Sequence, residues 1–271
     1  MEKKSWVCTV IIQLTLCFAL YYAINVGEPQ SPTHRLGIQR QPNEIYFISV
    51  RGGFRHLKEQ TRLLKQIEKV MNTYKVRFVI NISELGEDDP LLQNATHYFN
   101  PLKAPWYTTI ALQGMEPDYF FKQVNVSSGR TLDIIALNNG MIQDPSEVQL
   151  KGLSKKLELS NSNWHIAIGF HPLFCNQSLE QTQAKGNNVL HQMLMNNGVD
   201  AYLSGHPCAN EARIGGPYLT TISQGSDPSR EMANMFLLHR VSPLEIATYG
   251  VGFRGNIVHE STLRQRGMEV M

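Results

Sequence analysis

The sequence predicts an α/β fold built as one large domain. Strand-like apolar runs alternate with segments whose apolar residues recur at helical spacing, and the connections between them are short. This order is typical of layered α/β proteins with parallel strand pairs, and here it ends in an antiparallel portion. With 271 residues, of which 42% are hydrophobic and 18% charged, the chain is long enough to bury one large core.

The first half of the domain begins with a strand and continues with a helix. Residues 45–50 form a β-type apolar run, and Leu57, Leu64, Ile67 and Met71 then recur at helical spacing with charged residues between them. Further strands are predicted at 76–82, 107–112 and 132–137.

The second half repeats the alternation. An amphipathic helix is predicted at 147–159, a strand at 164–168, and a second helix at 187–197 with Gly198 as its C-cap. A strand at 199–203 follows, and the last third consists of short strands joined by turns. Because sites in such sheets lie beyond the carboxyl ends of the strands, we search for chemistry at those ends.

The N-terminal sequence predicts a targeting signal. Lys3 and Lys4 precede an apolar stretch that reaches residue 26. This pattern is typical of a cleaved signal peptide or of an uncleaved transmembrane signal-anchor, and the sequence leaves both alternatives open. Either one delivers the domain to the secretory pathway, as a secreted protein or as a luminal or extracellular domain on a membrane anchor. The expected organisation is 1–26 as this segment, 27–43 as a linker and 44–271 as the folded domain.

The net charge bears on the class of partner, and the cysteine content bears on a disulfide. A formal net charge of +2 without a long basic run argues against nucleic acid. Cys8 and Cys17 lie in the N-terminal segment, which leaves Cys175 and Cys208 in the domain. These two cysteines could pair in an oxidising compartment, but the sequence does not decide whether they do.

Three tripeptides match the N-glycosylation pattern in segments that we expect to be loops. Their acceptor residues are Asn94, Asn125 and Asn176. Asn81 also fits the pattern, but it belongs to a predicted buried strand, so we do not expect a glycan there.

Four segments carry a family resemblance. They read RFVINISELGEDDP, APWYTTIALQG, NWHIAIGFHPLFC and NNGVDAYLSGHPCANE. In order and spacing they resemble the metal-binding segments of purple and tartrate-resistant acid phosphatases, within the calcineurin-like metallophosphoesterase superfamily. The resemblance covers nearly the whole domain. It implies a four-layer α/β/β/α sandwich of two mixed sheets.

The catalytic chemistry of that family needs two metal ions roughly 3.5–4 Å apart that clamp the phosphate and activate a water. Most of the positions that the resemblance assigns to this site carry other residues here. Gly52 stands nearest the first aspartate, Glu84 replaces the bridging aspartate, and Glu87 replaces the tyrosine. Leu112 and Gln113 replace the asparagine ligand and the assisting histidine.

The last two segments depart from the family as well. Phe170 replaces a ligand histidine, and His171 comes one place later, on what should be the opposite side of the strand. Cys208 replaces another ligand histidine, so that only His206 keeps the family identity. We therefore expect no catalytic residue, no cofactor and no metal, with Phe170 and Leu112 packed into the former metal cavity.

Two weaker alternatives for the site follow from the same residues. Glu84, His206 and Cys208 could together hold at most one weakly bound zinc or iron ion. The Gly52-Gly53 turn before a helix could instead offer its N–H groups to an anion, with Arg51, Arg55 and His56 adding positive charge. For both sets of residues we favour the simpler interpretation: structural or solvated side chains for the first, a solvated turn for the second.

The predicted function is that of a catalytically inactive phosphatase relative, a pseudoenzyme that binds or scaffolds a protein partner. The alternative is an active acid phosphatase with an altered metal site, and a third possibility is gene decay without a selected role. Family relatives adapted to non-catalytic work include the gliding-motor anchor proteins of apicomplexan parasites, although no residue pattern ties this chain to them.

Overall fold

The computed structural model describes residues 10, 12–17, 43–99, 104–109, 119–127, 129–138, 142, 145–173, 183–205 and 235–265, with only the backbone for 183–188. The chain divides into two compact units, Met1–Arg35 and Leu36–Met271. In the first unit residues 12–17 are helical and Cys17 is exposed and free. Within the described ranges, no helix is both long and apolar enough to cross a membrane. Most of the predicted segment 1–26 lies outside those ranges.

The first sheet of the second unit has six strands in the order β10-β9-β8-β1-β2-β3. β1 runs parallel to β2, β2 runs parallel to β3, and β8, β9 and β10 continue the sheet in antiparallel fashion. The strands are β1 (Ile45–Arg51), β2 (Val79–Ile82), β3 (Trp106–Thr108), β8 (Met235–Val241), β9 (Glu245–Gly252) and β10 (Ile257–Arg264).

The second sheet has four strands in the order β4-β5-β6-β7. β4 is antiparallel to β5, whereas β5, β6 and β7 are parallel to one another, so this sheet is mixed as well. The strands are β4 (Tyr119–Ser127), β5 (Arg130–Leu137), β6 (Trp164–Gly169) and β7 (Ala201–Ser204).

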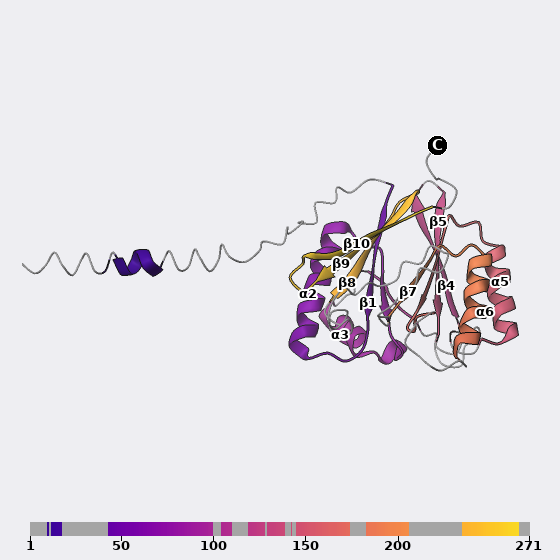
Figure 1. Cartoon of the computed structure of the whole chain (residues 1–271), viewed down its shortest axis with the longest axis horizontal. Helices are drawn as coiled ribbons and strands as arrows, with labels where there is room; N and C mark the ends of the chain where they lie inside the picture. The colour runs from indigo at the N-terminus through magenta and orange to yellow at the C-terminus, as the bar shows by residue number, and fades with distance from the viewer. Residues whose placement is uncertain are drawn as a thin grey trace, which may run out of the picture. The chain divides into compact units, whose positions relative to one another are not determined.

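Helices cover the outer faces of both sheets (Figure 1). α2 (Leu57–Tyr74) and α3 (Pro90–Tyr98) lie along the first sheet, and α5 (Glu147–Glu158) and α6 (Gln183–Asn196) lie along the second. Ser146 and Gln149 form a capping box at the start of α5, and Gly198, at φ +73°, follows the end of α6. The predicted four-layer α/β/β/α sandwich of two mixed sheets is therefore confirmed.

Three apolar clusters form the core. The first lies between α2, α3 and the six-stranded sheet, and the third lies between α5, α6 and the four-stranded sheet. The second cluster joins the two sheets face to face and contains Phe47, Trp164 and Ile166. The Trp164 indole N–H donates to the Ser242 carbonyl at 2.9 Å, so the buried polar atom of this large side chain is satisfied.

The order of elements agrees with the sequence prediction, but one α-helix and one strand were not predicted. α3 is only nine residues long, which is too short to show a clear helical period. β4 lies at an edge of its sheet, and its half-buried and exposed residues follow no regular alternation, with only Val126 buried among residues 119–126. Among the predicted elements, the strand expected at 107–112 is described only as the three residues of β3.

Candidate functional site

The parallel strands β1, β2, β6 and β7 end at the edge of the sheets where the family resemblance places its metal site. The chain leaves β1 through Gly52 and Gly53. The Gly52 N–H donates to the Ile82 carbonyl at 2.9 Å, which ties this turn to the end of β2. Gly53 adopts φ +100°, in the left-handed region that favours glycine. The turn therefore has a fixed conformation.

A buried carboxylate, Asp89, lies directly beneath this turn. One oxygen, Oδ2, accepts from the Gly53 N–H at 2.6 Å and from the Ser83 hydroxyl at 2.6 Å. The other oxygen, Oδ1, accepts from the N–H groups of Leu91 at 2.9 Å and Leu92 at 3.3 Å, so Asp89 is the N-cap of α3. Asp89 has no exposed surface. Its charge is stabilised by four donors and by the helix N-terminus.

Asp89 is not among the site residues expected from the sequence. The available signal was its position directly before Pro90, because an acidic N-cap followed by proline at the first helical position marks a helix start. That signal predicts the cap of α3. It does not predict the bond to Gly53, which lies 36 residues away in sequence.

Glu84 and His171 meet at the exposed rim of the site. His171 Nε2 lies 2.9 Å from Glu84 Oε1, and both side chains are partly exposed. The expectation that His171 lies on the opposite side is wrong, because β6 ends at Gly169 and the alternation of side chains does not extend to residue 171. Glu87, the other acidic candidate, is exposed on the short 3-10 helix η1 (Gly86–Asp88).

Phe170 lies where a ligand histidine was expected from the resemblance. Its ring packs against the cluster between the two sheets, and the Arg51 guanidinium lies 5.8 Å from its centroid. A Cβ atom added to Gly205 would come within 3.2 Å of Phe170 Cδ2, so the ring lies close to the end of β7. The aromatic ring supplies packing at this point and no metal-binding atom.

Arg55 turns back over the Gly52-Gly53 turn. Its guanidinium donates to the carbonyls of Gly53 and Arg51. Burial lowers the pKa of Arg55 to about 10, and the Asp89 carboxylate opposes that shift, so the side chain stays charged at neutral pH. Because Gly52 and Gly53 both donate their N–H groups inside the protein, the alternative of an external anion on this turn is not supported.

Several predicted site positions lie outside the described residues. These are Leu112, Gln113, His206, Cys208, Cys175 and Asn176. The three-ligand alternative and the cysteine pair therefore stay predictions. In the part of the chain that the structure describes, no group of three or more His, Cys, Asp and Glu side chains could hold a metal ion.

The predicted loop positions of two glycosylation acceptors are wrong. Asn94 lies within α3, where its amide nitrogen donates to Gln60 Oε1 at 2.9 Å. Asn125 is exposed on β4. Sequons mark a pattern of residues and not a conformation, which explains the difference.

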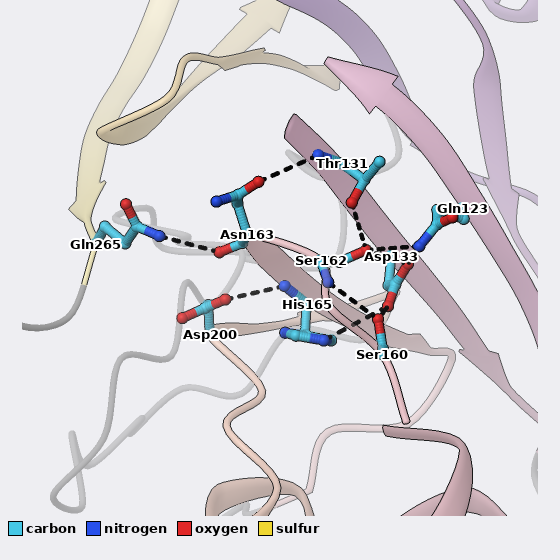
Figure 2. A network of polar contacts seen from close by, with 9 residues as sticks. All are labelled: Gln123, Thr131, Asp133, Ser160, Ser162, Asn163, His165, Asp200 and Gln265. Carbon is cyan, nitrogen blue, oxygen red and sulfur yellow. Dashed lines mark hydrogen bonds and ion pairs between the residues drawn. The ribbon is translucent and has the colours of Figure 1, made fainter. Parts of the chain in front are cut away.

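A second polar cluster lies at the amino ends of β5 and β6, at the opposite end of these strands (Figure 2). The buried Asp133 carboxylate accepts from the hydroxyls of Ser160 and Ser162, the latter at 2.7 Å, and from Gln123 Nε2 at 3.2 Å. His165 Nε2 lies 3.4 Å from the same carboxylate.

The arrangement of this second cluster argues for a structural role. In a serine hydrolase a histidine lies between the nucleophilic hydroxyl and the carboxylate. Here Ser160 and Ser162 donate directly to Asp133, so their protons are committed to the carboxylate and neither oxygen is activated as a nucleophile. The cluster joins β4, β5, β6 and the loop before β6.

The comparisons with known proteins concern the fold. No family model and no curated protein matches the chain. Among solved structures, GAP50, the anchor in the inner membrane complex of Plasmodium, has a TM-score of 0.60 and 17% identity over 83% of this chain and 90% of that chain. PhoD has a TM-score of 0.46 and 8% identity over 83% of this chain and 70% of that one. A predicted phosphoesterase from Streptococcus pneumoniae has a TM-score of 0.38 and 13% identity over 82% and 98%. The likeness to GAP50 shows that this chain has a mixed α/β fold similar to the fold of that protein.

Proposed function

We propose that the protein is a non-catalytic member of the purple acid phosphatase type that serves as a binding or scaffold protein of the secretory pathway. The observation that carries the proposal is the environment of Gly52. A buried Asp89 carboxylate, with hydrogen bonds to both of its oxygens, lies where a metal-binding aspartate on residue 52 would be expected from the resemblance.

Hydrolysis by two metal ions needs several converging carboxylates, imidazoles and amides. Gly52 and Phe170 supply none of these groups at two of the family positions. Asp89 supplies a carboxylate, but its oxygens already accept from four donors. These substitutions favour an inactive site that needs no counter-ion.

A protein partner is supported by apolar side chains near the same edge of the sheets. Phe54 is 86% exposed and Leu57 73% exposed after β1, and Leu85 is 44% exposed after β2. Since β1 and β2 are parallel neighbours, the segments that follow them leave the sheet at the same edge. We define Phe54, Leu57 and Leu85 as the apolar rim. Exposed apolar groups beside a polar site are typical of protein-binding surfaces.

The fold likeness to GAP50 is compatible with this role, because GAP50 is an anchor in a membrane complex. We extend the proposal to a membrane-attached or secreted form of the protein, with the N-terminal segment 1–26 as signal-anchor or signal peptide. Analysis of the mature N-terminus and carbonate extraction of membranes would distinguish these two forms.

The central experiment combines elemental analysis with a phosphatase assay on one preparation. Protein purified from a secretory host is expected to contain less than stoichiometric zinc, iron and manganese. It should also be inert toward p-nitrophenyl phosphate from acidic to neutral pH, including after incubation with each metal. A related active phosphatase from the same host is the positive control. Stoichiometric metal together with turnover would contradict the proposal.

The apolar rim can be tested with a photo-crosslinking residue at position 54 of the full-length chain in its native cells. A discrete crosslinked species is expected, and Leu57→Ser should suppress it. Leu159 is also 73% exposed, at the C-cap of α5 and away from β1 and β2 in sequence, so Leu159→Ser is the matched control and should leave the species unchanged. Equal effects of the two variants would argue against binding at the rim.

The second candidate function, an acid phosphatase with an altered metal set, is favoured by one observation. Glu84 and His171 bring a carboxylate and an imidazole within 2.9 Å of each other at the site. If the protein turns over phosphate esters, Glu84→Gln, His171→Ala and His206→Ala should each abolish that activity.

A further inference from the structure

We propose that Asp89 is a built-in ligand that closes the former metal site from within. Its carboxylate takes the volume that a carboxylate on residue 52 would need, so the end of β1 is an oxyanion-binding pocket whose occupant belongs to the chain itself.

The space around Gly52 has no room for a side chain. A Cβ atom added to Gly52 would lie 2.7 Å from Ser83 Cβ and 2.8 Å from Asp89 Cγ. Asp89 Oδ2 would be closer still. The Asp89 carboxylate therefore occupies space that a side chain at residue 52 would enter.

The Asp89 carboxylate is surrounded by hydrogen-bond donors. The Gly53 N–H, the Ser83 hydroxyl and the N–H groups of Leu91 and Leu92 all point at this carboxylate. A carboxylate offers about four acceptor positions, so the four donors saturate it. Arg55 lies close enough for the Asp89 charge to affect its pKa. A pocket lined by such donors and a positive charge favours an oxyanion as its occupant. Because all of its acceptor positions are used, Asp89 has no lone pair left to bind a metal ion.

The proposal predicts that residues 52 and 89 are coupled. Gly52→Asp alone should lower the melting temperature, because two carboxylates then compete for one volume. Asp89→Ala alone should lower it, because four donors lose their acceptor. Gly52→Asp should lower the melting temperature less in the Asp89→Ala background than in the wild type, by about 3 °C or more, because the new carboxylate regains the Gly53 and Ser83 donors. The contact with Ser83 Cβ is common to both backgrounds, so it cancels in this comparison.

Gly152 offers a matched control for the added aspartate. It lies in α5 with an exposed position, and the nearest atom to an added Cβ is Tyr119 Oη at 3.8 Å. Gly152→Asp should therefore shift the melting temperature equally in the wild-type and Asp89→Ala backgrounds. If Gly52→Asp lowers the melting temperature by as much in the Asp89→Ala background as in the wild type, or by more, the proposal is overturned.

Chemical rescue provides a second measurement. Formate should raise the melting temperature of Asp89→Ala in a saturable manner, because it can enter the vacated pocket and meet the same donors. It should leave the wild type unchanged relative to chloride at equal ionic strength. An equal rise in both proteins, or no rise in Asp89→Ala, would argue against an oxyanion pocket.

If a single variant does not fold, the yield of soluble protein replaces the melting temperature as the measurement. Accumulation of the folded double variant where Gly52→Asp or Asp89→Ala alone is insoluble would support the coupling, and failure of all three would contradict it. None of these measurements uses an enzyme assay or a partner. Turnover of a phosphate ester would therefore overturn the proposed function without deciding this inference.

Discussion

The imidazole of His239 is 1% exposed in the space between the two sheets. Its Nε2 lies 2.8 Å from the Ser49 hydroxyl, its Nδ1 lies 2.9 Å from the Thr248 hydroxyl, and its ring stacks on Phe47. Neutral imidazole can donate one of these bonds and accept the other, since each hydroxyl can serve in either role. Burial lowers the pKa of His239 to about 3, because the charged form would lose its hydration.

This residue should make the protein less stable in acid. In the unfolded chain the His239 pKa returns to about 6.5, so below that pH the unfolded state takes up a proton that the folded state refuses. The contribution is complete above pH 6.5 and is lost progressively as the pH falls toward 3. Between pH 7 and pH 5 the free energy of unfolding should fall by about 2 kcal/mol from this group. Urea unfolding at several pH values measures the slope.

His239→Gln should flatten that slope while lowering stability at pH 7, because glutamine does not titrate. His97→Gln is the control, since His97 is exposed on α3, and it should keep the slope of the wild type. A pH profile that His239→Gln leaves unchanged would assign the effect to other groups. Burial also lowers the pKa values of His191 and His259, and these histidines would act in the same direction.

At the scale of elements, polar clusters fix the two ends of the strands in different ways. At the carboxyl ends, Asp89 joins the turn after β1 to α3. At the amino ends, Asp133 joins β4, β5 and the loop before β6 (Figure 2). Both carboxylates are fully buried, and both are surrounded by donors. Each carboxylate therefore fixes the relative position of the elements that it joins, because directional hydrogen bonds restrict a displacement that apolar packing alone would allow.

Asp133→Ala should weaken the start of β5 and β6. The Ser160 and Ser162 hydroxyls and the Gln123 amide would lose a buried acceptor, at a cost of about 2–4 kcal/mol in the free energy of unfolding. Asp88→Ala, at an exposed position on η1, should cost less than about 0.5 kcal/mol. Urea unfolding gives the magnitudes, and faster hydrogen exchange confined to β4–β6 would locate the effect. A loss as small as that of Asp88→Ala would refute it.

The sequence predicts the helices and strands with long periodic patterns better than the short or edge elements. Helices α2 and α5 carry long periodic apolar patterns, and the structure confirms them. α3 and β4 lack such patterns, because the first is short and the second lies at a sheet edge. Contacts such as His171 with Glu84 depend on where two loops end in space, which no local pattern encodes. The family resemblance predicts a site at the ends of β1 and β2, and the buried Asp89 beside Gly53 and Ser83 was found only in the structure.

At the scale of the whole molecule, the second unit contains all three apolar clusters. The inter-sheet cluster draws on β1, β2, β4, β5, β6 and β7, and also on Val241 at the end of β8 and Ile246 in β9. The core is thus shared between the start and the end of the domain. Folding should require the C-terminal strands but not the N-terminal segment.

A chain of residues 36–271 should therefore fold alone, with a single cooperative unfolding transition by circular dichroism. A chain of residues 36–234 should not, because β1 loses its antiparallel neighbour β8 and the inter-sheet cluster loses Val241 and Ile246. Retention of a cooperative transition in the shorter chain would show that the first sheet does not depend on its antiparallel half.

Strand β10 ends the six-stranded sheet, and within the described residues it pairs with β9 alone. Its outer backbone groups could template the addition of a strand from another chain, which is a route to fibrils. Exposed Glu260 and Arg264 alternate along it with less exposed residues, so its outward face carries charge. Neutralising these two side chains would be expected to shorten the shelf life of concentrated solutions before it changed the melting temperature.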